Sequence, residues 1–456
     1  MAREAGVYVL LLPEPTEAQP DDYVAHSAWA GVSWWHDAAQ TADALKDWSP
    51  DWVIVDHYAF DARWQQYISS TCNTRIGVID DLGDRELFGE LLIDQNLHVN
   101  HRKKYLGLWP SDSRILGGPR YALLGPAFTG VKPLAISNTV SSIGIFMGGV
   151  DASGLSIIAL RACREFAGFT GRIEVVATKA LVGLHELISL AQKWPDTEIL
   201  CDLPDLASFF RRHDLQIGAA GGASWERCAV GAPSLLLLGA DNQKPVISAL
   251  REEGAVATLD PDQLLNEASV SSALLKLLDE PDRRTFLSKR SHSLVDGLGA
   301  TRVALAIGVS TLELRNSGPE DAVPTFHWRN HPETRRFFHD SSPLQLAEHC
   351  SWWDKTLIKP DCKLFIAFIG SRDVGVLRLD LKGNIAHLSI YIDPDFHGLG
   401  IGKEILRAAQ KWASQDMQAP WRLEAEVLAS NIISQRTFAK VGFMNCEQCW
   451  IWEPSK

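Results

Sequence analysis

The stretch Leu215-Gln-Ile-Gly-Ala-Ala-Gly-Gly-Ala-Ser-Trp-Glu-Arg227 joins an apolar run to a helix-forming segment through a loop of Gly, Ala and Ser. We therefore expect a buried strand, a tight loop and a helix. Free N–H groups at such a helix start bind anions, and Gly221 and Gly222 permit the close approach of a diphosphate. Ser224 would cap the helix or bond a phosphate, and the carboxylate of Glu226 would accept hydrogen bonds from ribose hydroxyls. The alternative is a strand-to-helix turn without a ligand.

Short apolar runs of the same kind recur through the first three hundred residues and alternate with helical patterns. They are Val7–Leu12, Trp52–Val55, Arg75–Ile79, Leu91–Ile93, Ile143–Met147, Ile173–Ala177, Leu215–Ala219 and Ser234–Leu238. Strands that alternate with helices form parallel sheets covered on both faces. Because the series is broken near 128–138, we predict two Rossmann-like lobes, residues 1–136 and 137–308, with a cleft between them.

The pattern changes after a predicted helix at Ala300–Ile307. A strand and two helical segments, Trp328–Phe338 and Gln345–Leu357, come next. Three further strands are separated by short turn sequences, as antiparallel hairpins require; these are Leu364–Ile369, Gly375–Asp380 and His387–Ile392. A glycine-rich loop, a helix, another strand and another helix complete a predicted α+β domain of residues 309–456.

Polar or small residues follow several predicted strands, at the edge where open α/β sheets bind ligands. Gly148 and Gly149 form a turn in which a second group of backbone amides would face the cleft. Asn242 and Gln243 follow another strand, where their amides would contact sugar hydroxyls or close a turn. His57 stands at a similar strand end, and a turn-forming role is its alternative.

The sequence His387-Leu-Ser-Ile-Tyr-Ile-Asp-Pro-Asp-Phe-His-Gly-Leu-Gly-Ile-Gly-Lys-Glu-Ile-Leu406 predicts a strand, a glycine-rich loop and a helix. The amides of Gly398 to Gly402 would suit a pyrophosphate at the start of that helix. A dinucleotide-binding βαβ unit is the rival interpretation, but the preceding strands form hairpins and no βαβ unit follows. The segment Asn431–Phe443, further along the chain, favours the first interpretation.

Composition excludes several classes of protein. The 456 residues carry 44 Lys and Arg against 56 Asp and Glu, so the formal net charge is −12 at pH 7. Nucleic-acid binding needs clustered basic residues, which an acidic chain does not favour. Hydrophobic residues make up 46%, enough to form a core and to argue against disorder. No apolar run approaches the ~18 residues that cross a bilayer, so we expect no membrane association.

The eight cysteines are scattered along the chain, and Cys446 and Cys449 form the one close pair. A structural zinc site needs about four ligands, and no second cysteine pair or histidine pair stands nearby. We therefore expect reduced thiols in a cytoplasmic protein, without a metal.

Eight short motifs in the first three hundred residues carry a family resemblance. They are Asp-His-Tyr (56–58), Ile-Asp-Asp (79–81), Leu-Ile-Asp-Gln-Asn (92–96), Tyr-Ala-Leu-Leu (121–124), Gly-Gly-Val-Asp (148–151), Ala-Gly-Gly-Ala-Ser-Trp-Glu-Arg (220–227), Asn-Gln (242–243) and Asp-Gly-Leu-Gly-Ala-Thr-Arg-Val (296–303). Over roughly residues 1–308 they resemble the UDP-2,4-diacetamido-2,4,6-trideoxy-β-L-altropyranose hydrolases of pseudaminic acid biosynthesis. The resemblance implies a GT-B fold related to the MurG-type glycosyltransferases, UDP held by residues 221–226, and displacement of UDP by water with inversion.

The sequence departs from this family at its start. Family members begin with a strand and a Gly-x-Gly-His-x-x-Arg loop whose His is the proposed general base, whereas Arg3-Glu-Ala-Gly6 already matches the helix after that loop. We therefore expect the first strand to be missing. Either the reading frame extends upstream, or this lobe does not hydrolyse its ligand. His57 is the nearest substitute base. Gly125 also replaces an Arg that usually follows Tyr-Ala-Leu-Leu.

The loop 398–402 and the segment 431–443 together resemble motifs A and B of the GNAT acetyltransferases, over about residues 310–456. The resemblance implies acetyl-CoA as co-substrate, with its pyrophosphate on the loop amides and its pantetheine arm near Asn431. A strand amide from 388–392 would stabilise the oxyanion. The implied binding residues are Leu388, Ile390, Ile392, His397 (in place of the usual Gln or Arg), Gly398, Leu399, Gly400, Ile401, Gly402, Lys403, Asn431 and Ser434.

The acceptor side carries a second resemblance. Trp328-Arg329-Asn330 and His349–Trp352 resemble the GNAT branch that acetylates the 4-amino group of a UDP-sugar in the same pathway. Arg329 and Asn330 are therefore implied substrate contacts. Trp352 and Trp353 would stack on uracil or the sugar, or pack in the core.

Acetyl transfer requires the acceptor amine to lose a proton and the leaving thiolate to gain one. Many GNAT enzymes use a Tyr for the second task, but Phe438 stands at the matching position and has no proton to donate. Tyr391, His387, Glu424 and Glu426 are the candidate groups, and ordered water is the alternative.

The prediction is a bifunctional enzyme of pseudaminic acid biosynthesis. It would acetylate UDP-4-amino-4,6-dideoxy-β-L-AltNAc with acetyl-CoA and then release UDP from the product. Two alternatives stay open: an N-acetyltransferase with a non-catalytic UDP-sugar-binding scaffold, and a protein N-terminal acetyltransferase of the RimJ/RimL kind. A glycosyltransferase is disfavoured, because nothing identifies an acceptor for it.

Overall fold

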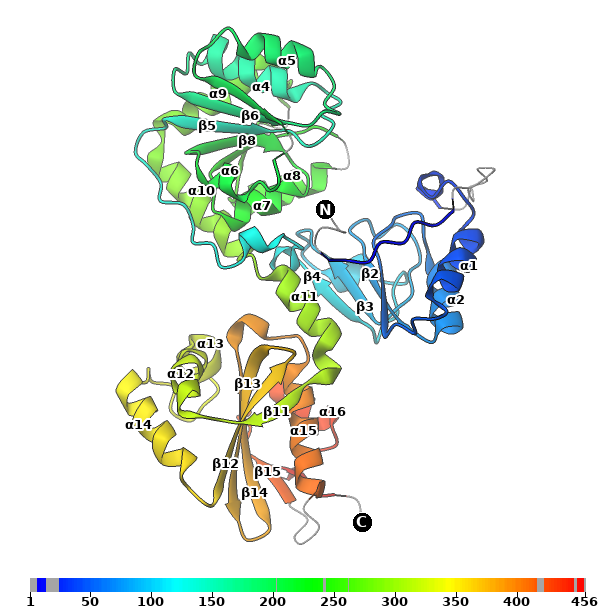
Figure 1. Cartoon of the computed structure of the whole chain (residues 1–456). Coiled ribbons are helices and arrows are strands. Elements are labelled where there is room, and N and C mark those ends of the chain that lie inside the picture. Colours follow the sequence, from blue (N-terminus) through cyan, green and yellow to red (C-terminus); the bar gives the residue numbers. More distant parts are fainter. Residues whose placement is uncertain are drawn as a thin grey trace. The chain divides into compact units, whose positions relative to one another are not determined.

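The computed structural model of the chain describes residues 6–13, 24–201, 203–240, 243–260, 262–415, 422–446 and 449–454. The chain divides into two compact units, Met1–Ala300 and Thr301–Lys456 (Figure 1). Each unit has its own sheets, and the fold is mixed α/β with parallel strands in the first unit and an α+β sheet in the second. The predicted boundaries at 136 and 308 stay predictions.

The first unit opens with a four-stranded parallel sheet in the order β1-β2-β3-β4. Its elements are α1 (Trp34–Leu45), β1 (Trp52–Val55), α2 (Ala62–Cys72), β2 (Arg75–Ile79), β3 (Leu91–Asp94), α3 (His101–Lys104) and β4 (Arg114–Gly117). The first three strands match the predicted runs to within one residue, and β4 was not predicted. The helices α1 and α2 pack on the sheet through a core that includes Trp64, Ile68 and Val78.

The predicted strand Val7–Leu12 is wrong. Residues 7–13 have no regular structure, and the side chains of Val7 and Leu11 are 55% and 77% exposed. Tyr8 instead stacks against Trp48, with ring centroids 5.1 Å apart. An apolar run forms a stable strand only where a neighbouring strand pairs with it, and no described strand pairs with this one.

A second parallel sheet follows, in the order β10-β9-β8-β5-β6-β7. Its strands are β5 (Ser142–Phe146), β6 (Arg172–Ala177), β7 (Thr197–Cys201), β8 (Leu215–Ala219), β9 (Ser234–Leu237) and β10 (Ala257–Thr258). Counted along the chain, this is the 3-2-1-4-5-6 order of a doubly wound sheet. The order reverses between β5 and β8, so the carboxyl ends of these two strands flank the switch point where such sheets bind ligands.

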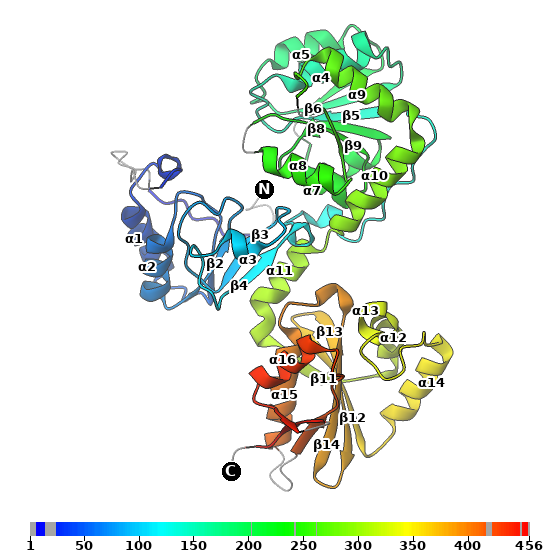
Figure 2. The same ribbon diagram turned by 180° about the vertical axis from the view of Figure 1, so that it is seen from behind.

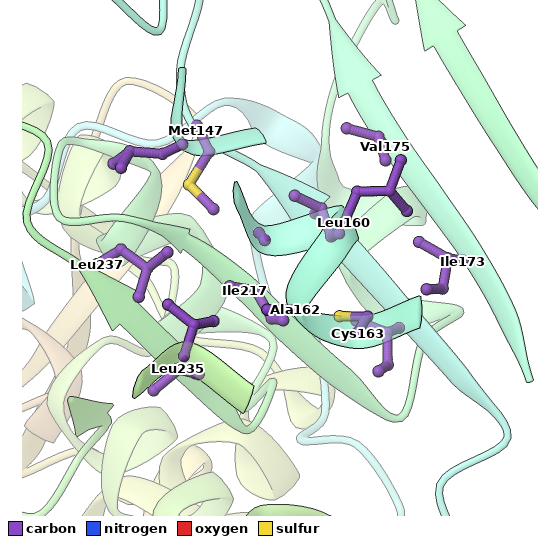
Figure 3. Close-up of a cluster of buried hydrophobic side chains, with 14 of the residues drawn as sticks. Met147, Leu160, Ala162, Cys163, Ile173, Val175, Ile217, Leu235 and Leu237 are labelled. Carbon is purple, nitrogen blue, oxygen red and sulfur yellow. The ribbon is translucent and has the colours of Figure 1, made fainter. Parts of the chain in front are cut away.

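Helices cover both faces of this sheet (Figures 1 and 2). One group is α4 (Leu155–Arg161), α5 (Leu184–Ala191) and α9 (Glu267–Asp279), and the other is α6 (Ala207–Arg211), α7 (Ala223–Ala229), α8 (Lys244–Glu252) and α10 (Pro281–Leu294). Alternate strand residues serve the two cores: Leu235 and Leu237 join the cluster of Figure 3, and Leu236 joins the opposite one. A strand buried on both faces reads as a continuous apolar run, which is why sequence located β5, β6, β8 and β9.

One segment, Pro281–Thr311, contains a stretch long and apolar enough to resemble a membrane span by length and composition. It is not one helix, because α10 ends at Leu294 and α11 (Gly299–Gly308) begins after a break. Core helices of globular domains pass the same test of length and composition, so this resemblance is weak evidence for a span.

The fully buried Arg284 of α10 holds the irregular segment that leads into β5. Its guanidinium donates to the carbonyls of Leu277 and Leu278 at the end of α9, and to those of Ser137 and Asn138. One side chain thus joins three parts of the first unit.

We expect Arg284→Met to destabilise the first unit by about 3 kcal/mol, because the buried Leu277 carbonyl loses its donor and three partly buried hydrogen bonds to carbonyls are lost as well. Calorimetric unfolding of the full chain measures this change. Arg283→Met is the control, because Arg283 makes only an exposed ion pair with Glu280, and such pairs contribute about 0–1 kcal/mol. Equal midpoints for the two variants would contradict the structural role of Arg284.

The second unit contains a seven-stranded sheet in the order β11-β12-β13-β14-β15-β17-β16. The strands are β11 (Glu313–Asn316), β12 (Cys362–Ile369), β13 (Arg372–Lys382), β14 (Ile385–Ile392), β15 (Arg422–Ala425), β16 (Met444–Cys446) and β17 (Cys449–Trp452). All pairs are antiparallel except β14 with β15. The predicted hairpin strands of this unit are present.

Helices flank this sheet as well (Figures 1 and 2). On one face lie α12 (Ala322–Asn330), α13 (Pro332–Arg335) and α14 (Leu346–Leu357), and on the other lie α15 (Ile401–Gln415) and α16 (Ile432–Lys440). Tyr391 of β14 points to the α12 and α14 face, where it packs against a core with Trp353. Its neighbour Ile392 approaches Gly402 of α15. The alternation along β14 therefore divides its side chains between the two layers.

Candidate functional site

The parallel pair β14–β15 separates part of the way along β14. Ile385, Ala386 and His387 are in register with β15, whereas the whole of β14 is in register with β13. Residues 388–392 therefore have no partner strand on the β15 side among the described residues. An unpaired strand edge of this kind can hydrogen-bond an extended ligand.

The glycine-rich loop follows this free edge of β14. Gly398 and Gly400 have φ angles of +86° and +85°, which are strained for residues with a Cβ atom. In the part of the chain that the structure describes, the N–H groups of Gly398, Gly400, Ile401 and Gly402 meet no acceptor. These amides stand at the start of α15, where an anion is favoured.

The loop and the strand edge are connected directly. His397 Nε2 lies 3.3 Å from the carbonyl oxygen of Ile392. A Cβ on Gly402 would stand 3.2 Å from Ile392 Cδ1, so the helix start lies close to the strand end. Leu399 and Ile401 are buried, so their side chains pack in the interior and do not form the ligand surface. The result is one continuous surface of backbone groups that suits a pyrophosphate joined to an extended, amide-containing arm.

Asn431 and Phe438 of the predicted second motif have structural contacts. Asn431 Oδ1 accepts a hydrogen bond from the Ser434 amide and caps α16. The Phe438 ring is 4% exposed and packs on Phe443 and Trp450. The predicted contact of Asn431 and Ser434 with a pantetheine arm stays a prediction.

Five side chains lie together beside the free edge of β14, and we call them the acceptor cluster: Arg329, Phe338, His339, Tyr391 and Glu426. The Arg329 guanidinium lies 3.3 Å from the centre of the Phe338 ring, and the Phe338 and Tyr391 rings are 6.5 Å apart. His339 Nε2 lies 3.0 Å from Glu426 Oε2, and both side chains are exposed. Phe338 and His339 are members that sequence reasoning missed.

Two donors in the acceptor cluster are buried without partners. The hydroxyl of Tyr391 and Nη1 of Arg329 form no hydrogen bond of good geometry within the described residues; the Thr325 hydroxyl near Tyr391 donates to the Asp321 carbonyl instead. Burial raises the pKa of Tyr391, against smaller effects of Thr325, Arg329 and Arg378, so the phenol stays protonated. Burial lowers the pKa of Arg329. Native proteins rarely leave buried donors unpaired, so an acceptor-bearing ligand is expected here.

Other residues of the second unit that were predicted to act in the site make contacts within the protein. The Asn330 side chain bonds both the N–H and the carbonyl of Leu344, so it holds this loop in place; one N–H of the amide remains, and the predicted substrate contact stays a prediction. His387 and Glu424 form a cross-strand contact of 3.7 Å on the paired part of β14, away from the free edge. Trp353 is fully buried and donates to the Gly318 carbonyl, so it is a core residue.

The loop after β8 is exposed at Gly221 and Gly222, whose amides meet no acceptor in the described chain. The predicted capping role of Ser224 is wrong, because Gly222 is the N-cap of α7. The Ser224 hydroxyl is buried next to Arg227, and its predicted phosphate contact stays a prediction. The geometry is compatible with the predicted ribose contact of Glu226, because its partly buried carboxylate has no hydrogen bond to a described residue. Burial raises its pKa, and Asp205 adds to this effect against Arg227.

The loop after β5 is arranged differently. Asp151 accepts hydrogen bonds from the amides of Leu155 and Ser156, so its carboxylate already occupies the start of α4. The Gly148–Gly149 turn therefore offers backbone amides without a helix end. Gln243 accepts a bond from the Gly239 amide, and its Nε2 faces the position of Gly221. Asn242 lies outside the described residues.

The polar groups at the strand ends of the first sheet bond to one another. Asp80 pairs with Arg85 at 2.7 Å, Asp94 pairs with Lys104 at 2.7 Å, and the Tyr105 hydroxyl contacts both carboxylates. Buried ions that are paired in this way hold the fold and leave no free group for a ligand. Within the described residues, no three His, Cys, Asp or Glu side chains are grouped as metal ligands.

His57 is held at the edge of that network. Its Nδ1 accepts a hydrogen bond from the Ala59 amide, and its ring stacks on Phe60. Burial lowers its pKa. A neutral imidazole whose Nδ1 is an acceptor carries its proton on Nε2. The ring therefore has no free lone pair with which to accept a proton, and the geometry does not favour His57 as a general base.

The comparisons with known proteins agree with the geometry of the second unit. Residues 311–444 match the family model described as an acetyltransferase (GNAT) domain. The second unit therefore contains a GNAT acetyltransferase domain, which supports N-acetyltransferase activity with acetyl-CoA.

Two related proteins match this chain in sequence, one over most of its length and one over less than half. MJ1062 of Methanocaldococcus jannaschii, described as uncharacterized, is 22% identical over 435 residues, or 90% of this chain and 85% of that protein. The spore coat polysaccharide biosynthesis protein SpsG of Bacillus subtilis is 23% identical over 194 residues, or 42% of this chain and 57% of that protein.

Two solved structures were also similar over part of the chain. A domain from Methanocaldococcus jannaschii is 25% identical with a TM-score of 0.28, covering 31% of this chain and 97% of its own. The aminoglycoside acetyltransferase AAC(6')-Ib with coenzyme A is 14% identical with a TM-score of 0.29, covering 31% and 94%.

We expect Gly398→Ala to weaken acetyl-CoA binding about tenfold or more, because a Cβ at φ +86° strains the loop whose amides face the ligand. Isothermal titration measures the affinity. Gly383→Ala is the matched control: Gly383 has φ +60° and open space around it, but lies in the β13–β14 turn. Equal affinities for both variants would contradict the assignment of the loop.

Proposed function

We propose that this protein is an acetyl-CoA-dependent N-acetyltransferase whose acceptor is a UDP-4-amino-sugar, specifically UDP-4-amino-4,6-dideoxy-β-L-AltNAc. The observation that carries the acetyl-transfer part is the free edge of β14 next to the unpaired amides of loop 398–402. The proposed compartment is the cytoplasm, and the eight cysteines are all free thiols, as reducing conditions would require.

The proposed mechanism uses backbone groups for the acetyl donor. The amides of Gly398, Gly400, Ile401 and Gly402 bind its pyrophosphate, and the edge of residues 388–392 bonds its amide-containing arm. An N–H of this edge donates to the thioester oxygen and stabilises the negative charge that develops when the amine attacks. Because these donors belong to a strand and a helix start, they need little reorganisation during the reaction.

The acceptor cluster would orient the sugar and move protons. Arg329 and Tyr391 provide donors without acceptors, so they fit a substrate that brings oxygen atoms, such as a diphosphate or an acetamido carbonyl. Glu426 and His339 are exposed and would take the ammonium proton, directly or through water. The protonated Tyr391 would then donate to the leaving thiolate.

We further propose that the first unit binds the UDP moiety at the switch point of its second sheet. The loop amides near Gly221, the carboxylate of Glu226 and the amide of Gln243 support this assignment. The relative SpsG is a polysaccharide biosynthesis protein by name, which agrees with a sugar-nucleotide ligand. Hydrolysis of the acetylated product is the second candidate activity, favoured by the ordered motifs of residues 56–303. The geometry of His57 favours binding without hydrolysis.

We expect Tyr391→Phe to reduce kcat for acetylation by roughly 10- to 100-fold, as loss of a proton donor does. Its thermal midpoint should not fall, because the lost hydroxyl is buried and unpaired. Steady-state coenzyme A release with the UDP-amino-sugar measures the rate. Tyr67→Phe, at an exposed tyrosine of the first unit, is the control.

An unchanged kcat in Tyr391→Phe would remove this side chain from the mechanism. Acetylation of peptides in place of the UDP-amino-sugar by the unmodified chain would establish the protein N-terminal acetyltransferase and contradict the proposed acceptor.

We expect Glu226→Gln to weaken UDP binding about tenfold, because the charged acceptor for the ribose hydroxyls is lost. Titration calorimetry on the full chain measures the affinity. Glu186→Gln is the control, since Glu186 lies on the exposed side of α5. An equal effect of both variants would contradict the ribose contact. Release of UDP from the acetylated sugar by the unmodified chain would establish the hydrolase activity.

A further inference from the structure

Arg227 of α7 is a buried cation with unpaired nitrogen atoms. Its side chain is 1% exposed, and Nη2 donates to the Ala219 carbonyl at 2.6 Å and to the Ser224 hydroxyl at 3.3 Å. Nε and Nη1 are buried and meet no partner among the described residues. An arginine stays charged inside a protein, so this positive charge is present in the interior.

Two other buried arginines of the first unit have more partners than Arg227. Arg85 forms an ion pair with Asp80 at 2.7 Å, and Arg284 donates to four carbonyls, although its Nε is unpaired and it forms no ion pair with a described carboxylate. Arg227 forms no ion pair with a described carboxylate, although Glu226 is its neighbour in sequence. A buried charge without a counter-ion is costly, which suggests that its counter-ion is not part of the protein.

The position of Arg227 suggests what that counter-ion is. A Cβ on Gly218 would stand 2.4 Å from Arg227 Nη1 and 2.7 Å from the Phe146 carbonyl oxygen. The guanidinium therefore lies at the carboxyl ends of β8 and β5, which flank the switch point of the doubly wound sheet. Ala219, whose carbonyl it holds, leads directly into the exposed loop at Gly221 and Gly222.

We propose that Arg227 is a positioning residue for the diphosphate of a UDP-sugar, whose negative charge compensates the buried guanidinium from across the loop 219–223. The inference rests on the proposed UDP site. Arg227 does not touch the ligand: it supplies positive potential beneath the loop and fixes the Ala219 carbonyl. The diphosphate should therefore depend on Arg227 far more than the uridine does.

The test compares UDP, UMP and uridine as ligands of the full chain, with affinities from titration calorimetry and, for uridine, competition NMR. The variants are Arg227→Met, Arg227→Lys and Arg227→Gln. The control is Arg211→Met, which removes an exposed positive charge from the same unit. Circular dichroism establishes whether each variant is folded. If Arg227→Met is not folded, Arg227→Gln takes its place as the neutral variant.

The expected result is a loss of at least tenfold in UDP affinity for the neutral variants, a smaller loss for UMP, and no more than twofold for uridine. Arg227→Lys keeps most of the UDP affinity, and Arg211→Met keeps all of it. Equal losses for UDP and uridine would mean a purely structural role and overturn the inference, as would unchanged UDP affinity. Absence of UDP binding in the unmodified chain would instead overturn the proposed site itself.

Discussion

The short pairing between β14 and β15 is the constraint on which the second unit depends. These strands are in register over three residues, and β14 then continues with one edge unpaired. Backbone groups must be bonded by the chain, by water or by a ligand. The sheet keeps its shape because β13 pairs with all of β14, so the edge is both open and rigid. The glycine-rich loop begins where this edge ends, and together they form a surface for a long ligand with a charged end.

Buried polar groups of this chain differ in how completely the chain itself pairs them. The carboxylates Asp80 and Asp94 are buried and fully paired, as expected for residues that hold a fold. Tyr391, Arg329 and Arg227 are buried with atoms left unpaired. Unpaired atoms also occur at structural positions, such as Nε of Arg284, so they support a ligand site only where exposed loop amides or an open strand edge lie beside them.

Much of the fold could be predicted from the sequence, because strands buried on both faces have continuous apolar runs. The predicted bounds of β2 and β8 are those of the structure. The edge strands β4, β7 and β10 lack that signal. β4 and β7 contain polar residues, and β10 has only two residues. The strand prediction for Val7–Leu12 is wrong for the opposite reason. The composition of this run suits a strand, but a strand also needs a neighbouring strand to pair with, which composition does not reveal.

The candidate site was predictable only where backbone chemistry decides it. Glycines at positive φ identified loop 398–402, because the sequence itself specifies that conformation. Side-chain roles were less predictable: Ser224 turned inward to Arg227, and Asn330 bonded the backbone of Leu344. Phe338 and His339 reach the site from a loop distant in sequence from β14, and a short aromatic run at 337–339 was their one signal.

Hydrogen–deuterium exchange of the full chain, with and without acetyl-CoA, tests the central claim most directly. The account predicts slower exchange at the free-edge amides of 388–392 and at 398–402, with no change in the β13–β14 turn at 383–384. Unchanged exchange in both of the first two segments, under conditions where acetyl-CoA is bound, would contradict it.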